Sequence, residues 1–323
     1  MLRIHFSAAD VLGTRISAAP DPLWELLLSL HAAQTVGIAG TLRAWRTAVR
    51  GKLAPSAALL WPLARPVGYS PDFLTPTAGE TDLGTGLDQL VATSTTKLRA
   101  DLSLLAKRTR LTSWMTDLAD GRSAALDRLR AALEAYHAAA IEPFSEVIRQ
   151  AVGMDRERRA ATAVAKGLGC MLTTLHPDIR WDDGVLEVAY PVEQEVRLDG
   201  RGLTLVPSFF CQPGPITLLT QTERPVLVYP VDRELAFGAL RGHARLDRSL
   251  AALLGKTRAR VLYAIAATAP ITTTDLARAV GVSAAGVSQH TAVLREAGLI
   301  TTVRDRGYAV HHVSVRGRSL LIG

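Results

Sequence analysis

The last quarter of the chain constrains the fold most, because helix and turn signals follow one another there in a fixed order. An amphipathic pattern predicts a helix that Pro270 ends. Thr272 is a good N-cap for a short second helix over residues 273–280. Gly281 then provides the left-handed backbone conformation that a tight reversal between two helices needs. Two helices should therefore lie close together across this glycine.

A third helix and a hairpin follow the glycine turn. Ser283 is the expected N-cap of the third helix, which continues to Ala297 and ends at Gly298. Two strand-like runs over residues 299–304 and 308–313 then flank a short turn. Helix, short helix, glycine turn, helix and hairpin is the order of a winged helix-turn-helix domain, whose last helix enters the DNA major groove.

The same segment resembles the ArsR type of bacterial repressor over roughly residues 249–320. The motif residues are Leu254, Gly255, Arg258, Val261 and Leu262 in the first helix, Leu276, Ala277, Val280, Gly281, Val282 and Ser283 around the turn, and Val287 to Ile300 in and after the third helix. The resemblance implies a homodimer that binds an imperfect palindrome in double-stranded DNA. It also implies that the helix beginning at Ser283 contacts base edges.

By this resemblance, small residues at the start of the third helix permit close approach to DNA, and polar residues contact bases or phosphates. The position of His290 orients the helix or touches phosphate, and packing is an equal alternative. The residues expected at the DNA are Ser283, Ala285, Gly286, Ser288, Gln289, His290, Thr291, Arg295, and the hairpin residues Arg304 and Arg306. The expected core residues are Leu276, Val287, Val293, Leu294, Leu299 and Ile300.

We expect no metal site and no cofactor. Residues 273–280 lack the cysteines of metal-sensing family members, and the neighbours His311 and His312 point to opposite faces of a strand. Cys170 and Cys211 have neither zinc-site nor disulfide-framework spacing. Only residues 315–323 follow the hairpin, so we expect much of the dimer contact to come from the N-terminal domain or the linker.

The charge distribution agrees with a partner that carries phosphates. Residues 249–323 hold nine Lys or Arg against three acids, a net charge of +6 in a chain whose total is +7. A basic surface of this kind neutralises phosphates and releases their counterions. The most apolar stretch, residues 23–30, is short and contains Glu25, so we expect a cytoplasmic protein that does not span a membrane.

Residues 1–235 are predicted to form an α+β domain, and a helical linker over 236–248 leads to the winged helix-turn-helix domain at 249–323. Asp21 and Pro22 begin a buried helix. Apolar stripes predict further helices between residues 86 and 168, with separate helices at 143–148 and 154–166, and strands are predicted at 3–7, 15–17, 185–188, 193–198, 203–206 and 226–229. The expected fold class is mainly α with small antiparallel sheets.

Three roles are open for the N-terminal domain. As an effector sensor, it would hold a small apolar ligand in a pocket lined by the aromatic residues Trp24, Trp61, Trp114, Trp181, Phe209 and Phe210. As an enzyme, it offers neither a GxSxG elbow, a phosphate-binding loop, a dinucleotide fingerprint nor a HExxH pair, and only Cys170 with His176 as nucleophile and base. As an oligomerisation domain, it would need no ligand. We expect a ligand-controlled transcriptional repressor, not an enzyme.

Overall fold

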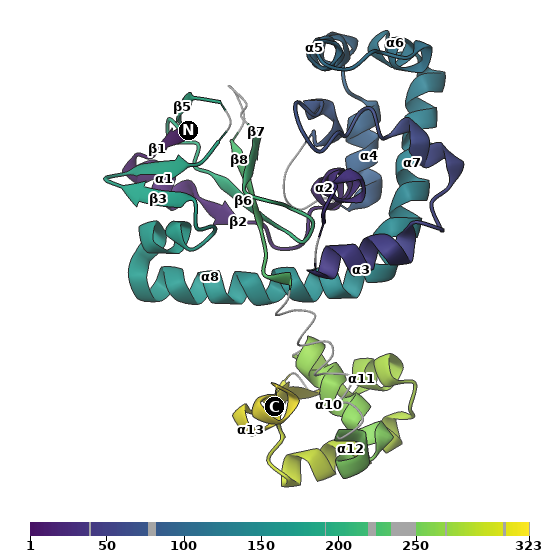
Figure 1. Ribbon diagram of the computed structural model, residues 1–323. Coiled ribbons are helices and arrows are strands. Elements are labelled where there is room, and N and C mark those ends of the chain that lie inside the picture. Colours follow the sequence, from purple (N-terminus) through teal and green to yellow (C-terminus); the bar gives the residue numbers. More distant parts are fainter. Residues whose placement is uncertain are drawn as a thin grey trace. The chain divides into compact units, whose positions relative to one another are not determined.

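The computed structural model describes residues 1–38, 40–76, 82–190, 192–218, 224–233, 250–268, 270–305 and 308–322. The chain divides into two compact units, Met1–Ala236 and Phe237–Gly323, and each is described by itself (Figure 1). The linker that the sequence predicts at 236–248 lies outside the described residues.

Helices make up most of the N-terminal unit. They are α1 (Ala8–Gly13), α2 (Pro22–Gln34), α3 (Gly40–Val49), α4 (Leu83–Val91), α5 (Thr95–Ala106), α6 (Ser113–Ala119), α7 (Ser123–Ala140) and α8 (Ser145–Thr173), with 3-10 turns at Pro55–Leu59, Asp72–Leu74 and Glu142–Phe144. The start of α2 follows the prediction, because the Asp21 carboxylate accepts hydrogen bonds from the backbone N–H groups of Leu23 and Trp24, and Pro22 occupies the first turn.

The described residues of the N-terminal unit also form two small sheets. One has the strand order β3-β4-β1-β5, built from β1 (Leu2–His5), β3 (Ile179–Asp182), β4 (Val185–Val188) and β5 (Gln194–Arg197). The other has the order β2-β6-β8-β7, built from β2 (Arg15–Ile16), β6 (Thr204–Ser208), β7 (Ile216–Leu218) and β8 (Val226–Pro230). Figure 1 shows α8 running along one side of this unit, where it contacts β3 and β6.

The mainly helical fold with small sheets is confirmed, but three details differ from the prediction. Both sheets are mixed rather than antiparallel, because β1 pairs in parallel with β5, and β6 pairs in parallel with β2 and β8. The strand predicted at 15–17 is shorter, because β2 contains only Arg15 and Ile16. The two helices predicted at 143–148 and 154–166 are not separate, because residues 145–166 form one continuous stretch of α8. Pro143 belongs to the 3-10 turn before α8, and α8 is kinked at Gly167, which has a non-helical backbone conformation.

A buried carboxylate joins α2 to the loop that follows β6. Glu25 is 1% exposed. Its Oε1 accepts a hydrogen bond from the backbone N–H of Phe209 at 2.8 Å, and its Oε2 accepts from the Ser208 hydroxyl at 2.9 Å and from the backbone N–H of Phe210 at 3.1 Å. Burial outweighs these three donors and raises the pKa of Glu25 to about 7.

The described residues of the C-terminal unit form four helices and one small sheet. The elements are α10 (Lys256–Thr268), β9 (Ile271–Thr272), α11 (Thr273–Val280), α12 (Ala284–Glu296), β10 (Ile300–Asp305), β11 (Tyr308–Val313) and α13 (Val315–Ile322). The antiparallel strands have the order β10-β11-β9. Residues from all three helices of the motif meet in one core, among them Leu262, Leu276, Val287 and Leu294.

Within the parts of the chain that the structure describes, no helix has both the length and the apolar character needed to cross a bilayer.

Candidate nucleic-acid interface

The turn between α11 and α12 fixes the direction in which α12 leaves the core. Gly281 has a φ of 66° and a ψ of 38°, the left-handed conformation that the sequence predicts there. The Ser283 hydroxyl then accepts a hydrogen bond from the backbone N–H of Gly286 at 3.2 Å and caps α12. The start of α12 is therefore held at a defined angle to α11.

One face of α12 is buried and the other is open. Val287, Thr291 and Leu294, spaced four and three residues apart, face the core. The remaining surface of α12 exposes several of the residues predicted to contact DNA. The exposed ones on α12 and at its N-cap are Ser283, Ala285, Ser288, Gln289 and Arg295. An amide and a hydroxyl with small neighbours can approach base edges closely, so this face has the chemistry of direct readout.

Two predictions for α12 are wrong. Thr291 is 2% exposed, and its hydroxyl donates to the backbone oxygens of Val287 at 2.9 Å and Ser288 at 3.1 Å, so it cannot contact DNA. Val293, predicted as core, is 43% exposed because it lies on the open face.

Gly286 and His290 are half-buried members of the same prediction. A Cβ atom at Gly286 would lie 2.8 Å from Cγ1 of Val282, so packing within the turn also requires a glycine at this position.

The β10–β11 hairpin corresponds to the wing. Arg304 is exposed on β10 opposite Ala309. Arg306 lies outside the described residues. The exposed Arg304 guanidinium is available for phosphate or minor-groove contact.

A buried histidine, whose role no local sequence pattern indicates, ties the wing to the start of α11. His311 is 2% exposed on β11. Its Nε2 lies 2.9 Å from Oγ1 of Thr273, and its Nδ1 lies 3.0 Å from Oγ1 of Thr302. Burial lowers the pKa of His311, and the positive charges of Arg295 and His312 lower it further. One uncharged ring therefore links the wing to the helix-turn-helix.

The enzyme alternative can be tested against two clusters in the N-terminal unit. The first, Cys170 with His176, is not assembled for catalysis. Cys170 is exposed on α8. The Nε2 atom of His176 lies 3.2 Å from the backbone oxygen of Pro213, and its Nδ1 accepts a hydrogen bond from the backbone N–H of Asp178. Both ring nitrogens are thus engaged by groups other than the thiol.

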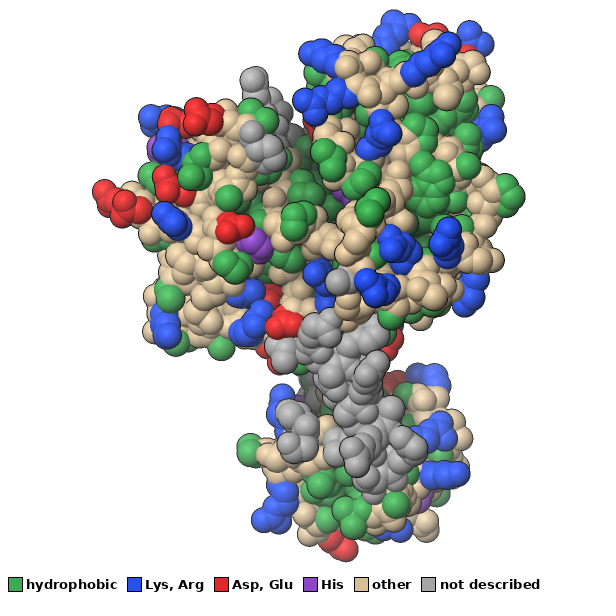
Figure 2. Space-filling model, viewed as in Figure 1, with side chains coloured by type: hydrophobic (Ala, Val, Ile, Leu, Met, Phe, Trp, Pro, Cys, Tyr) green, Lys and Arg blue, Asp and Glu red, His purple; other side chains and the backbone are tan. Residues whose placement is uncertain are grey.

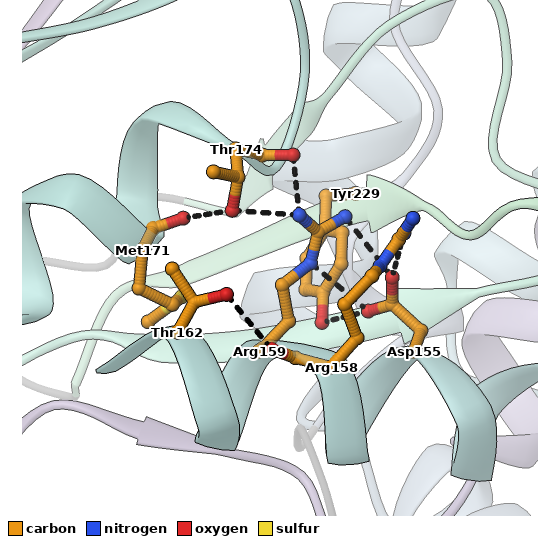
Figure 3. A network of polar contacts seen from close by, with 7 residues as sticks. All are labelled: Asp155, Arg158, Arg159, Thr162, Met171, Thr174 and Tyr229. Atoms are coloured by element: carbon orange, nitrogen blue, oxygen red, sulfur yellow. Dashed lines mark hydrogen bonds and ion pairs between the residues drawn. The ribbon is translucent and has the colours of Figure 1, made fainter. Parts of the chain in front are cut away.

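The second cluster is a buried ion pair on α8 (Figure 3). Asp155 accepts a hydrogen bond from the Tyr229 hydroxyl at 2.7 Å and forms ion pairs with Arg158 and Arg159 at 2.8 and 3.0 Å. Arg159 also donates to the backbone oxygen and hydroxyl of Thr174. The side chains of Asp155 and Arg159 are 0% and 5% exposed, so a substrate cannot reach them in this state. The network joins α8 to β8 and has a structural role.

The aromatic residues predicted to line the effector pocket do not border the apolar cavity beside α2. Trp24, Phe209 and Phe210 are buried, and Phe209 packs edge-on against Phe210 at 5.1 Å between ring centroids. A small apolar cavity between α2 and α7, lined by residues including Leu27 and Leu133, has a volume of about 10 Å³. That volume suits about one water molecule, not a drug-sized ligand.

The capped helix with an open polar face, the glycine turn and the anchored hairpin together define a winged helix-turn-helix domain of a DNA-binding transcription regulator. Residues 254–307, which contain α10, α11, α12 and β10, match the MarR family. No curated protein and no solved structure matches the chain.

The match supports a winged-helix regulator and does not support the ArsR subtype that the sequence resemblance implied. The motif residues behind that resemblance, Leu254 to Ile300, all lie inside the matched range. They form the helices and the turn that any winged helix-turn-helix domain has, so they specify the fold rather than one family of it.

Proposed function

We propose that the chain is a sequence-specific DNA-binding repressor, in which the N-terminal half of α12 enters the major groove and the wing contacts the adjacent backbone. The observation that carries the proposal is the exposure of Ser288 and Gln289 on a helix whose opposite face is anchored in the core. We propose repression because a protein bound at a promoter sterically excludes other proteins from the same DNA.

Residues 249–323 would contact the DNA, and residues 1–235 would supply much of the contact between two copies in a homodimer. An imperfect palindrome, with half-sites one or more helical turns apart, is the expected operator. Control by a small apolar effector is a finer hypothesis. It is supported by the size of the N-terminal unit, whereas the cavity of about 10 Å³ does not support it.

The proposal is tested by incubating the full chain with sheared DNA from its own genome and sequencing the fragments that it retains. Enrichment of fragments that share a palindromic motif is expected. Uniform recovery of all fragments, or recovery of none, would contradict sequence-specific binding.

Two substitutions then test the division of work within the interface. Gln289→Ala should lower affinity for the enriched motif by about 5- to 150-fold and relax the preference at one base pair, because a bidentate amide–base contact is worth about 1–3 kcal/mol. Arg304→Ala should lower affinity for all sequences about equally.

The matched control for Arg304→Ala is Arg278→Ala. It removes an arginine whose charge is already paired with Asp275 at 2.9 Å, and it should change affinity little. Fluorescence anisotropy on the motif and on single-base variants gives both readouts. A uniform loss for Gln289→Ala would contradict base readout by this residue.

A further inference from the structure

The N-terminal unit has a basic face on α3 that the DNA-binding domain does not explain. Between Glu25 and Asp72 the sequence contains no acidic residue and five Lys or Arg. Four of these cations, Arg43, Arg46, Arg50 and Lys52, lie on α3 or directly after it. We call these four residues the α3 basic face. Figure 2 shows Lys and Arg side chains gathered over α3.

The packing of α3 determines which way these side chains point. Thr41, Leu42, Trp45 and Val49 form the buried face, and the indole N–H of Trp45 donates to the backbone oxygen of Ala140 on α7 at 2.7 Å. The three arginines are spaced three and four residues apart, so they form one stripe on the side away from the core. Arg43, Arg50 and Lys52 are exposed, and Arg46 is half-buried.

Two of the arginines are held in place by backbone carbonyls rather than by acids. Nε of Arg43 donates to the backbone oxygen of Ile38 at 3.2 Å, and Nη1 of Arg46 donates to the backbone oxygen of Thr35 at 2.6 Å. No ion pair joins any member of the α3 basic face to an acidic residue among those described. The guanidinium groups of Arg43 and Arg46 are therefore oriented, and within the part of the chain that the structure describes no acidic side chain neutralises them.

The surface between the cations carries small side chains. The exposed residues beside the arginines on α3 are the small Ala44, Thr47 and Ala48. A row of guanidinium groups with donors to spare, flanked by small side chains, matches a regularly spaced row of phosphates better than an apolar partner.

We infer that the α3 basic face binds the phosphate backbone of the same DNA molecule that α12 reads. This inference rests on the proposed function, because a duplex bound by the C-terminal unit brings a polyanion to the N-terminal unit of the same chain. The contact adds affinity and lengthens the protected DNA without adding base preference. The basic surface of the protein thus has a second part outside the winged helix-turn-helix domain.

The salt dependence of binding measures the number of phosphate contacts and does not require the operator to be known. The probe is a fluorescein-labelled duplex of mixed sequence, about 40 base pairs or roughly four helical turns long. The full chain is compared with the triple variant Arg43→Gln, Arg46→Gln, Arg50→Gln, in which glutamine keeps a side-chain donor and removes the charge. Each lost phosphate contact lowers the slope of log K against log salt by about 0.9, so the triple variant should lower it by about 2.7.

The matched control is Lys107→Gln, Arg108→Gln, Arg110→Gln. These three exposed cations follow α5, and their replacement removes the same charge from the same unit. The control should leave the slope almost unchanged. When the salt concentration is raised from about 50 to about 200 mM, the affinity of both proteins falls. The factor by which it falls should be roughly 40 times smaller for the α3 variant than for the unmodified chain.

The outcomes separate this inference from the proposed function. If the unmodified chain binds the duplex but the α3 variant has the same slope, the inference is overturned while the proposed function stands, and an acidic protein becomes the better partner for α3. Equal losses of slope in the two triple variants would also overturn it, because they would show a diffuse charge effect. No binding by the unmodified chain would overturn both. Unchanged unfolding temperatures would show that the variants are folded.

Discussion

The buried carboxylate of Glu25 makes the stability of the N-terminal unit depend on pH in an unusual direction. Water is excluded from this group, and its pKa is raised to about 7 even though three donors face it. In the unfolded chain the same carboxyl has a pKa near 4.5. Between these two values the folded protein binds one proton more than the unfolded chain.

The magnitude follows from the difference between the two pKa values. Because the folded state holds the extra proton, stability falls as the pH rises, by about 1.4 kcal/mol per pH unit between the two values. The full effect is about 3 kcal/mol. It is absent below the unfolded pKa and complete above pH 7. Most acidic groups in proteins act in the opposite direction, since their pKa values are lowered by folding.

Glu25→Gln isolates this effect because glutamine has the same shape and does not titrate. At about pH 5 the variant should be less stable than the unmodified chain by about 1–3 kcal/mol, because its amide N–H groups oppose donors of the β6 loop. Between about pH 5 and about pH 8, the free energy of unfolding of the variant should rise by about 3 kcal/mol relative to that of the unmodified chain.

Urea unfolding followed by tryptophan fluorescence measures this difference. All five tryptophans, at positions 24, 45, 61, 114 and 181, belong to the N-terminal unit, so the signal reports that unit alone. Glu157→Gln, which removes an exposed carboxylate from α8, is the matched control. A difference between Glu25→Gln and the unmodified chain that stays constant from about pH 5 to about pH 8 would refute the reasoning.

Two further predictions concern the stability of the C-terminal unit. This unit contains no tryptophan, so its unfolding is measured by calorimetry, as the transition that has no counterpart in the tryptophan fluorescence. The pKa of His311 is lowered, so the unfolded state takes up a proton first and the unit should lose stability as the pH falls below the ordinary histidine range. His311→Gln should remove that loss, and its persistence would contradict the assignment. Gly317→Ala should destabilise the unit by about 3 kcal/mol, because the new Cβ would lie 2.0 Å from the backbone oxygen of Leu299. Gly281→Ala, whose Cβ would meet nothing within 4 Å, should cost only about 1–2 kcal/mol for its positive φ, and equal costs at the two sites would argue against the packing explanation.

The helix-turn-helix was predictable from sequence because its signals are local. Thr272, Gly281 and Ser283 each act on backbone groups within a few residues, and each has the predicted role in the structure. The burial of Thr291 had a local signal too, since Thr291 lies four residues after Val287 and three before Leu294. The hydroxyl suggested a DNA contact, but the helical period places it in the core.

The parts that sequence did not predict depend on residues far apart in the chain. The parallel pairings of β1 with β5 and of β6 with β8 are set by how distant segments pack, and a strand pattern has no direction. The burial of Asp155 was hidden because it lies in a charged run of α8 that resembles an exposed helix, and its partner Tyr229 is 74 residues away. Arg306 on the hairpin stays a prediction.

The position of β1 has a consequence for how the protein is made. β1 lies inside its sheet, between β4 and β5, and its partners are Val185–Val188 and Gln194–Arg197. A growing polypeptide on the ribosome therefore synthesises a central strand long before either neighbour exists. The N-terminal unit must wait for about 190 further residues before this sheet can close. Until then Leu2 and Ile4, which are fully buried in the folded protein, have no sheet to enter.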